Sequence, residues 1–356
     1  MSLALAAGLL ARAPSAVGQS AVPPTSSQFF AAFSGYLDAL RVQAGIPGMT
    51  AAIVGNPTVL WNQAFGWLDI ASSTPMRTDT PFQFDDLTQL VTATMVLQCV
   101  DQGTLSLDTP VGNYTPSSPY ASATVRQILT YTSGAPGNLT FTYDTARVDP
   151  LRFVVEGCTG LTFRQAFTKT LQRLGMMDSV PGPDAALPEL PNADVASPAD
   201  AARYKSILLR LPTPYAVNTQ NVPAVTSYAV KTLGAATGLV STVFDFAKFD
   251  LAFRQGQLGI SGATRQLAWS NPIAASGLPL PHGMGWFVQT YNGEPVVWQF
   301  GISAAASSSL VVTLPNRNVT LILLANSDGL AKPASLAAGD VTVSPFARVF
   351  LGLVVK

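Results

Sequence analysis

Charged residues are scarce in this sequence. Only 11% of its 356 residues are charged, against roughly 25% in an average soluble domain. The 20 Lys and Arg residues match the 20 Asp and Glu residues in number, so the formal net charge is zero. A chain without a net field does not draw nucleic acid or an anionic membrane toward it. We therefore predict no nucleic-acid partner and a surface rich in uncharged polar residues.

Long apolar runs are missing as well. No segment reaches the roughly 20 consecutive apolar residues that a membrane-spanning helix needs. A short apolar run at residues 3–10, followed by small residues at Ala16 and Gly18, is typical of a secretory signal. No Lys or Arg precedes this run, so an ordinary N-terminal helix is the alternative. We predict a signal peptide over residues 1–18, a linker over 19–28, and a secreted or periplasmic protein without a transmembrane segment.

Histidine occurs once, at His282, which limits both triad and metal chemistry. A Ser-His-Asp triad would have only this base, and its place in Pro-His-Gly-Met-Gly predicts a turn residue instead. With one histidine, carboxylates are the main candidate ligands, and Asp85, Asp86 and Asp144 could form at most a weak cation site. No phosphate-binding glycine loop is visible, and we predict neither a metal nor a cofactor.

The chain has only two cysteines, Cys99 and Cys158, and both lie in apolar helical patterns. Export would permit a disulfide between them. One pair cannot be assigned from sequence alone, and we favour buried free thiols.

The spacing of apolar residues changes along the chain. Helical spacing over residues 29–42 and 87–100 predicts two helices. β-prone runs predict strands near both ends of the chain, at residues 49–54, 59–66, 284–289, 296–299, 310–314 and 319–325. This order predicts an α+β fold over residues 29–356. Its antiparallel sheet would be built from both ends of the chain and flanked by helices, with a mostly helical subdomain inserted at about residues 84–235.

Several sequence blocks, taken in order, resemble one protein family. They include GWLD, TPMRTDTPF, VRQILTYTSG, GLVST, GMGW and LLANS, and they lie between residues 66 and 327. Together they resemble the serine β-lactamases and penicillin-binding proteins, of the class C β-lactamase and D-alanyl-D-alanine carboxypeptidase type. The resemblance covers residues 29–326 and implies the β-lactamase/transpeptidase-like form of the α+β fold.

The resemblance places Asp86 and Gln89 where the family has its catalytic serine and lysine. In the family the serine attacks a carbonyl group, and the lysine one helical turn later helps remove its proton. A carboxylate is a poor acyl acceptor, and a glutamine amide is not basic at neutral pH. The chain has no Ser-x-x-Lys and no Gly-x-Ser-x-Gly motif elsewhere. At a helix start, Asp85 and Asp86 are expected to act as stabilising caps, so that a fixed carboxylate fills a site meant for an oxyanion.

Two further family motifs are altered. Tyr-x-Asn aligns with residues 143–145, which keeps Tyr143, the counterpart of the family's proton-transfer residue. The strand motif of Lys or His, Ser or Thr, and Gly aligns with residues 299–301, where the cationic or imidazole head is lost and a ring replaces the hydroxyl. The candidate catalytic positions are Asp86, Gln89 and Tyr143, and the candidate ligand-binding residues are Thr145, Gln299, Phe300 and Gly301.

All three family motifs have lost polar side chains that the family uses for catalysis or ligand recognition. This loss predicts a pseudoenzyme. It would bind a peptide, a cell-wall fragment or a small acyl compound in the retained cleft. One alternative is an active enzyme with a changed mechanism, in which Asp86 is the general base and Tyr143 the acid, on an ester, lactone or non-acyl substrate. Another is a structural or partner-binding domain without a ligand.

Overall fold

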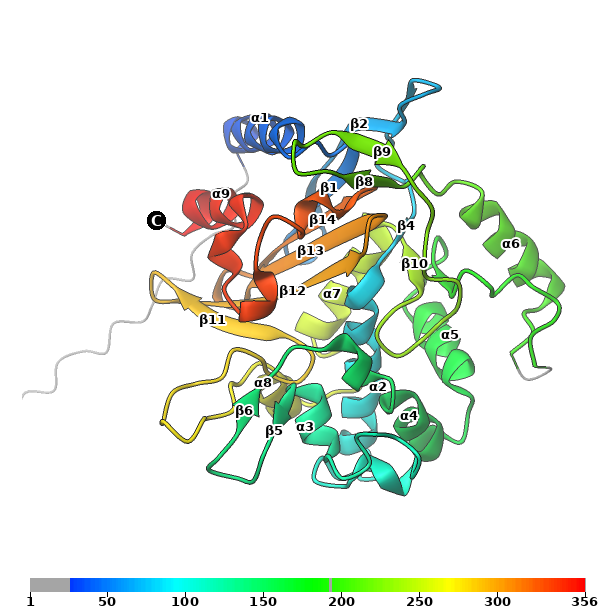
Figure 1. The fold of residues 1–356 in the computed structure, drawn as a ribbon, viewed down its shortest axis with the longest axis vertical. Helices are drawn as coiled ribbons and strands as arrows, with labels where there is room; N and C mark the ends of the chain where they lie inside the picture. Colours follow the sequence, from blue (N-terminus) through cyan, green and yellow to red (C-terminus); the bar gives the residue numbers. More distant parts are fainter. Residues whose placement is uncertain (1–25, 192–193, 356) are drawn as a thin grey trace, which may run out of the picture.

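The structure is a computed structural model that describes residues 26–191 and 194–355 (Figure 1). The predicted signal peptide lies outside the described residues, as does most of the predicted linker. Helix α1 (Ser27–Gln43) begins inside the predicted linker, because Ser26 caps it by accepting a hydrogen bond from the Phe29 N–H. Within the described ranges, no helix is long and apolar enough to cross a bilayer.

A seven-stranded antiparallel sheet joins the two ends of the chain. Its order is β11-β12-β13-β14-β1-β2-β3. The strands are β1 (Gly48–Val54), β2 (Val59–Asp69), β3 (Thr74–Pro75), β11 (Phe287–Tyr291), β12 (Glu294–Ser303), β13 (Ser307–Leu314) and β14 (Val319–Ala325). The first and last parts of the chain meet where β1 pairs with β14, with Met49 opposite Ala325. The predicted α+β fold is confirmed.

One predicted strand starts later than expected. Residues 284–286 are not part of β11, because the Gly283 N–H bonds to the Trp286 carbonyl and Gly285 adopts a positive φ of 99°. A chain that turns in this way cannot join the ladder until Phe287. Apolar spacing could not show the turn, since Met284 and Trp286 are both buried.

Each face of the sheet packs against its own apolar core. Alternate residues of β1 separate between the two cores, with Met49 and Ile53 in one and Ala52 and Val54 in the other. Helices α1 and α9 (Pro345–Val354) lie side by side over the first face (Figure 1). Helices α2 (Thr88–Asp101) and α7 (Val243–Arg254) contribute to the second core.

The remaining α-helices and short strands lie between β3 and β11 in the sequence. The helices are α3 (Val125–Leu129), α4 (Leu151–Thr159), α5 (Phe163–Arg173), α6 (Pro198–Leu208) and α8 (Gly262–Ala268). The short strands are β4 (Phe82–Gln83), β5 (Thr132–Ser133), β6 (Thr140–Phe141), β7 (Val180–Pro181), β8 (Tyr215–Val217), β9 (Pro223–Val225) and β10 (Leu239–Ser241). The boundaries of a helical subdomain at about residues 84 and 235 stay a prediction.

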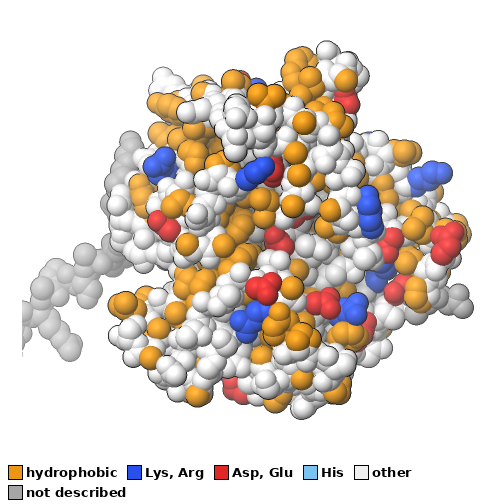
Figure 2. Space-filling model, in the orientation of Figure 1, with side chains coloured by type: hydrophobic (Ala, Val, Ile, Leu, Met, Phe, Trp, Pro, Cys, Tyr) orange, Lys and Arg blue, Asp and Glu red, His pale blue; other side chains and the backbone are white. Residues whose placement is uncertain are grey.

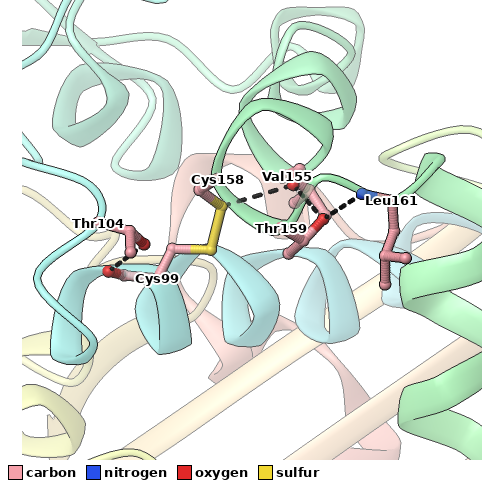
Figure 3. The surroundings of a disulfide bond; sticks show 6 residues. All are labelled: Cys99, Thr104, Val155, Cys158, Thr159 and Leu161. Atoms are coloured by element: carbon pink, nitrogen blue, oxygen red, sulfur yellow. Dashed lines mark hydrogen bonds between the residues drawn. A yellow bond between two sulfur atoms is a disulfide. The ribbon is translucent and has the colours of Figure 1, made fainter.

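Helix α2 is buried over most of its length, as the helical spacing of residues 87–100 predicts. Its C-terminal end carries a disulfide between Cys99 and Cys158, which joins α2 to α4 (Figure 3). The Cα atoms of the pair are 6.1 Å apart, a normal distance for a disulfide. The prediction of free thiols is wrong, because sequence spacing could not show that cysteines 59 positions apart lie on neighbouring helices.

Candidate active site

The candidate site lies where strand β4 leads through the short helix η1 (Asp85–Leu87) into α2. Strand β12 approaches this corner very closely at Gly301. A Cβ atom at Gly301 would lie 2.6 Å from the Phe84 carbonyl oxygen and 3.0 Å from the Asp86 nitrogen. Only glycine fits this contact without a shift, so Gly301 positions the strand and brings its backbone to Asp86.

The carboxylate of Asp86 points to the strand and not along its own helix. It accepts a hydrogen bond from the Ile302 N–H on β12 at 3.3 Å. The Thr145 side chain and the backbone N–H of Asp86 also stabilise its charged form, but burial outweighs them and raises its pKa to about 6. Neither η1 nor α2 has a side-chain cap. The expected N-cap hydrogen bond of Asp86 is therefore absent, while Asp85 and Asp86 do lie in the first turn of η1, as expected.

Asp85 is buried beside Asp86 and has a separate partner. Its backbone is in the left-handed region, at a φ of 48°, and its carboxyl accepts a hydrogen bond from the Ser307 hydroxyl at 2.8 Å. Burial raises the pKa of Asp85 well above its usual value, and the neighbouring Asp86 charge adds to the rise. Its carboxyl does not cap the helix either.

The weak cation site considered for Asp85, Asp86 and Asp144 does not form. Asp144 is exposed and accepts a hydrogen bond from the Ala146 N–H at 3.1 Å. In the part of the chain that the structure describes, no three His, Cys, Asp or Glu side chains are grouped so that they could hold a metal ion.

The other site residues form one chain of hydrogen bonds. The Tyr131 hydroxyl donates to Gln89 Oε1 at 2.7 Å, and Gln89 Nε2 donates to the Tyr143 hydroxyl at 3.1 Å. The Tyr143 hydroxyl donates to Gln299 Oε1 at 3.3 Å. Gln299 Nε2 lies 3.2 Å from His282 Nε2. The structure therefore brings Gln89, Tyr143 and Gln299 together, as the motif positions predicted.

His282 is the last residue of this hydrogen-bond network, and it is a neutral acceptor. Its Nδ1 lies 2.7 Å from the Gly283 carbonyl oxygen, so Nδ1 carries the proton and Nε2 accepts from Gln299. Complete burial lowers the pKa of His282 to about 3. His282 lies at the edge of the predicted turn, where it forms an isolated bridge with Phe287 inside an aromatic cluster. An imidazole with this pKa cannot act as a general base at neutral pH.

Tyr131 is a site residue that the sequence did not single out. It is fully buried, and its ring centroid lies 4.6 Å from that of Tyr143. Burial raises the pKa of both tyrosines well above the usual value, which keeps both hydroxyls neutral. Tyr131 lies in the VRQILTYTSG block, which indicated the fold. The block could not indicate a role in the site, because the partner Gln89 is distant in the sequence.

Most side chains of this hydrogen-bond network are buried. Gln89 is 2% exposed, and Tyr131, His282 and Gln299 are 0% exposed. Phe300, expected among the ligand-binding residues, packs its ring 5.4 Å from that of Tyr143 and is 6% exposed. Tyr143 and Thr145 are half-buried and remain partly accessible. Figure 2 shows Lys and Arg side chains scattered over this face of the molecule and not gathered beside one site.

Comparison with known proteins gives the family and the fold. The beta-lactamase family model matches residues 29–342. Penicillin-binding protein 4 of Amycolatopsis lactamdurans is 36% identical over 128 residues, which are 34% of this chain and 33% of that protein. The match therefore spans about a third of that relative's length.

Two solved structures agree over most of the chain. The octameric penicillin-binding protein homologue from Pyrococcus abyssi has a TM-score of 0.71 at 16% identity, and the match covers 90% of this chain and 77% of that one. The class C beta lactamase from Rhodobacter sphaeroides has a TM-score of 0.62 at 15% identity, covering 83% and 94%. These likenesses confirm the β-lactamase/transpeptidase-like fold. The chain belongs to the beta-lactamase family.

Proposed function

We propose that this chain is a member of its family that does not form an acyl-enzyme and that binds a ligand without hydrolysing it. The observation that carries the proposal is the Asp86 carboxylate, which accepts a hydrogen bond from the Ile302 N–H. The motif alignment predicts that Asp86 stands at the position of the family's serine. A carboxylate there offers no hydroxyl for acyl transfer. At the lysine position, the Gln89 amide is engaged at both ends by tyrosine hydroxyls and offers no basic group.

The ligand we propose is a peptide, a cell-wall fragment or a small acyl compound. Tyr143 and Thr145 would touch it, because they are the partly accessible members of the site. The Asp86 carboxylate, with its pKa of about 6, disfavours an anionic group at the start of α2.

We also propose that the protein is secreted or periplasmic. The Cys99–Cys158 disulfide supports this, since disulfides persist mainly in oxidising compartments.

The first test is covalent labelling of the wild-type protein. We expect no labelling by a fluorophosphonate probe and no turnover of a chromogenic β-lactam or a p-nitrophenyl ester, because no activated serine stands at the site. Intact-protein mass spectrometry measures the labelling. Stoichiometric modification of any serine would refute the proposal.

The positive control for the labelling experiment is the double variant Asp86→Ser with Gln89→Lys. A lysine at position 89 would lie between the hydroxyls of Tyr131 and Tyr143, which now hold the glutamine amide. We expect this variant to be labelled slowly, since it regains a nucleophile and a base on one helix face. An unlabelled double variant would mean that the closed site, and not only the missing groups, prevents acylation.

A second candidate function is hydrolysis by a changed mechanism. It is favoured by the pKa of about 6 at Asp86, which suits a general base near neutral pH. If a substrate screen finds an activity, Asp86→Asn should reduce its kcat by at least about 100-fold, the usual contribution of a general base. Asp108→Asn is the control, because Asp108 is an exposed carboxylate paired with Arg126. An unchanged rate in Asp86→Asn would exclude this mechanism.

A further inference from the structure

A cavity of about 390 Å³ lies away from the candidate active site, on the side of the sheet that α1 and α9 cover. Four segments of the chain surround it: the end of α1, the turn between β8 and β9, the short helix η5 (Asp328–Leu330) with the loop after it, and the start of α9. Its lining does not include Asp86, Gln89 or Tyr143. A ligand in this cavity would therefore not occupy the candidate active site.

Close contacts between these segments fix the walls of the cavity. Gly45 has a positive φ of 66°, and a Cβ atom there would overlap the Asn221 carbonyl oxygen, so glycine lets the β8–β9 turn pack on the end of α1. The Asn221 side-chain amide donates to the Gln43 carbonyl at 2.9 Å. The Asp328 carboxylate accepts from the Val217 N–H at 2.9 Å, which ties β8 to η5. The cavity is thus formed in the free protein, and a preformed site lowers the ordering cost of binding.

The lining of the cavity is mainly apolar. Leu330 and Phe346 belong to the core of this side of the sheet, and Leu40, Ala44 and Ala334 pack against the same core. Small-molecule sites are typically apolar cavities of roughly 300–1,000 Å³ with a few polar groups. This cavity is near the small end of that range, so it suits a ligand with a short apolar body.

Arg348 is the one charged residue among the described residues that line the cavity. It is exposed, and none of the ion pairs between described residues involves it. The carboxylate of Asp328 on η5 is paired with Lys332 at 2.9 Å instead. A guanidinium stays charged at neutral pH and matches the geometry of a carboxylate. The cavity therefore combines an apolar lining with an uncompensated positive group.

We propose that this cavity is a second binding site, which takes a medium-chain fatty acid with its carboxylate paired to Arg348. The alkyl chain lies against the apolar lining, where its removal from water supplies most of the binding free energy. The ion pair selects an acid over a neutral molecule of the same length. The inference goes beyond the proposed function, because this site shares no residue with the candidate cleft.

The test is titration of the wild-type protein with octanoate at neutral pH, measured by isothermal titration calorimetry. We expect saturable binding with one site per chain. Arg348→Gln should weaken the binding about fivefold, the factor for the roughly 1 kcal/mol of an exposed ion pair. Because Arg348 is exposed, this substitution should leave the fold intact. Lys205→Gln, which removes an exposed cation of α6, is the matched control and should leave the Kd unchanged.

Octanol and a filled cavity separate the two parts of the site. Octanol has the same chain without the carboxylate, so its affinity should not respond to Arg348→Gln. Ala334→Phe places a ring in the cavity and should abolish the binding of octanoate and octanol alike. Ala334 is only half-buried, so its loop can accept the larger side chain.

Absence of saturable octanoate binding to the wild type would overturn the inference. Octanoate binding that either Arg348→Gln or Ala334→Phe leaves unchanged would also overturn it, since the ligand would then lie elsewhere or without its ion pair. A wild-type dimer that Ala334→Phe dissociates on size-exclusion chromatography would do the same, because a second copy of the chain would then fill the cavity. These results are independent of the labelling test, which concerns the candidate active site.

Discussion

Reduction of the Cys99–Cys158 disulfide should lower the free energy of unfolding by about 4 kcal/mol. The bond closes a loop between positions 59 residues apart and therefore restricts the unfolded chain strongly. It also ties α2, whose start carries the candidate site, to α4. Urea unfolding of oxidised and reduced protein, each followed by tryptophan fluorescence, measures the difference.

The variant Cys99→Ala with Cys158→Ala is the control for this experiment. Its stability should lie near that of the reduced wild type, and a reductant should not change it further. Mass spectrometry after thiol alkylation should find no free thiol in the oxidised wild type and two after reduction. Equal stability of the oxidised and reduced wild type would contradict the prediction.

The wild type should lose stability relative to Asp86→Asn as the pH rises from 4 to 8. Burial raises the folded-state pKa of Asp86 from 3.8 to about 6. A raised carboxyl pKa means that the folded state holds the proton more tightly, so the stability it contributes is present below pH 4 and is lost as the pH rises through 6. The shift corresponds to a change of about 3 kcal/mol in the stability difference between the two proteins.

Urea unfolding at several pH values between 4 and 8 tests this prediction. Asp85 is present in both proteins, so the effect of its burial cancels in the difference. The rise in its pKa that the Asp86 charge causes is lost in Asp86→Asn and adds to the expected effect. Asp108→Asn is the matched control, because Arg126 lowers the pKa of Asp108 and the linked change falls below pH 4. A stability difference between wild type and Asp86→Asn that stays constant from pH 4 to 8 would show that Asp86 is not desolvated.

Local sequence patterns predicted much of the fold. The helix at residues 29–42 is α1, and the strand at residues 319–325 is β14 with the same bounds. Such elements follow from apolar periodicity, which reports directly on the faces that a helix or strand buries. The predicted start of strand β11 was wrong because residues 284–286 form a turn with buried side chains. Burial alone does not distinguish a turn from a strand.

The candidate site was predicted in part. Motif positions alone brought Asp86, Gln89, Tyr143 and Gln299 to one place. They did not indicate Tyr131 or His282, which complete the hydrogen-bond chain, since each is buried among partners distant in the sequence. They also did not show that the Asp86 carboxylate turns toward β12.

The sequence by itself determined that this chain has the fold of its family, and it predicted a carboxylate and an amide at the family's serine and lysine positions. Residue identity and local periodicity are sufficient for both. Only the tertiary structure decided what these groups do, because hydrogen-bond partners, burial and pKa depend on segments that meet in space. The Asp86 carboxylate accepts a hydrogen bond from the Ile302 N–H of β12, and the two cysteines form a disulfide, through contacts that no local pattern contains.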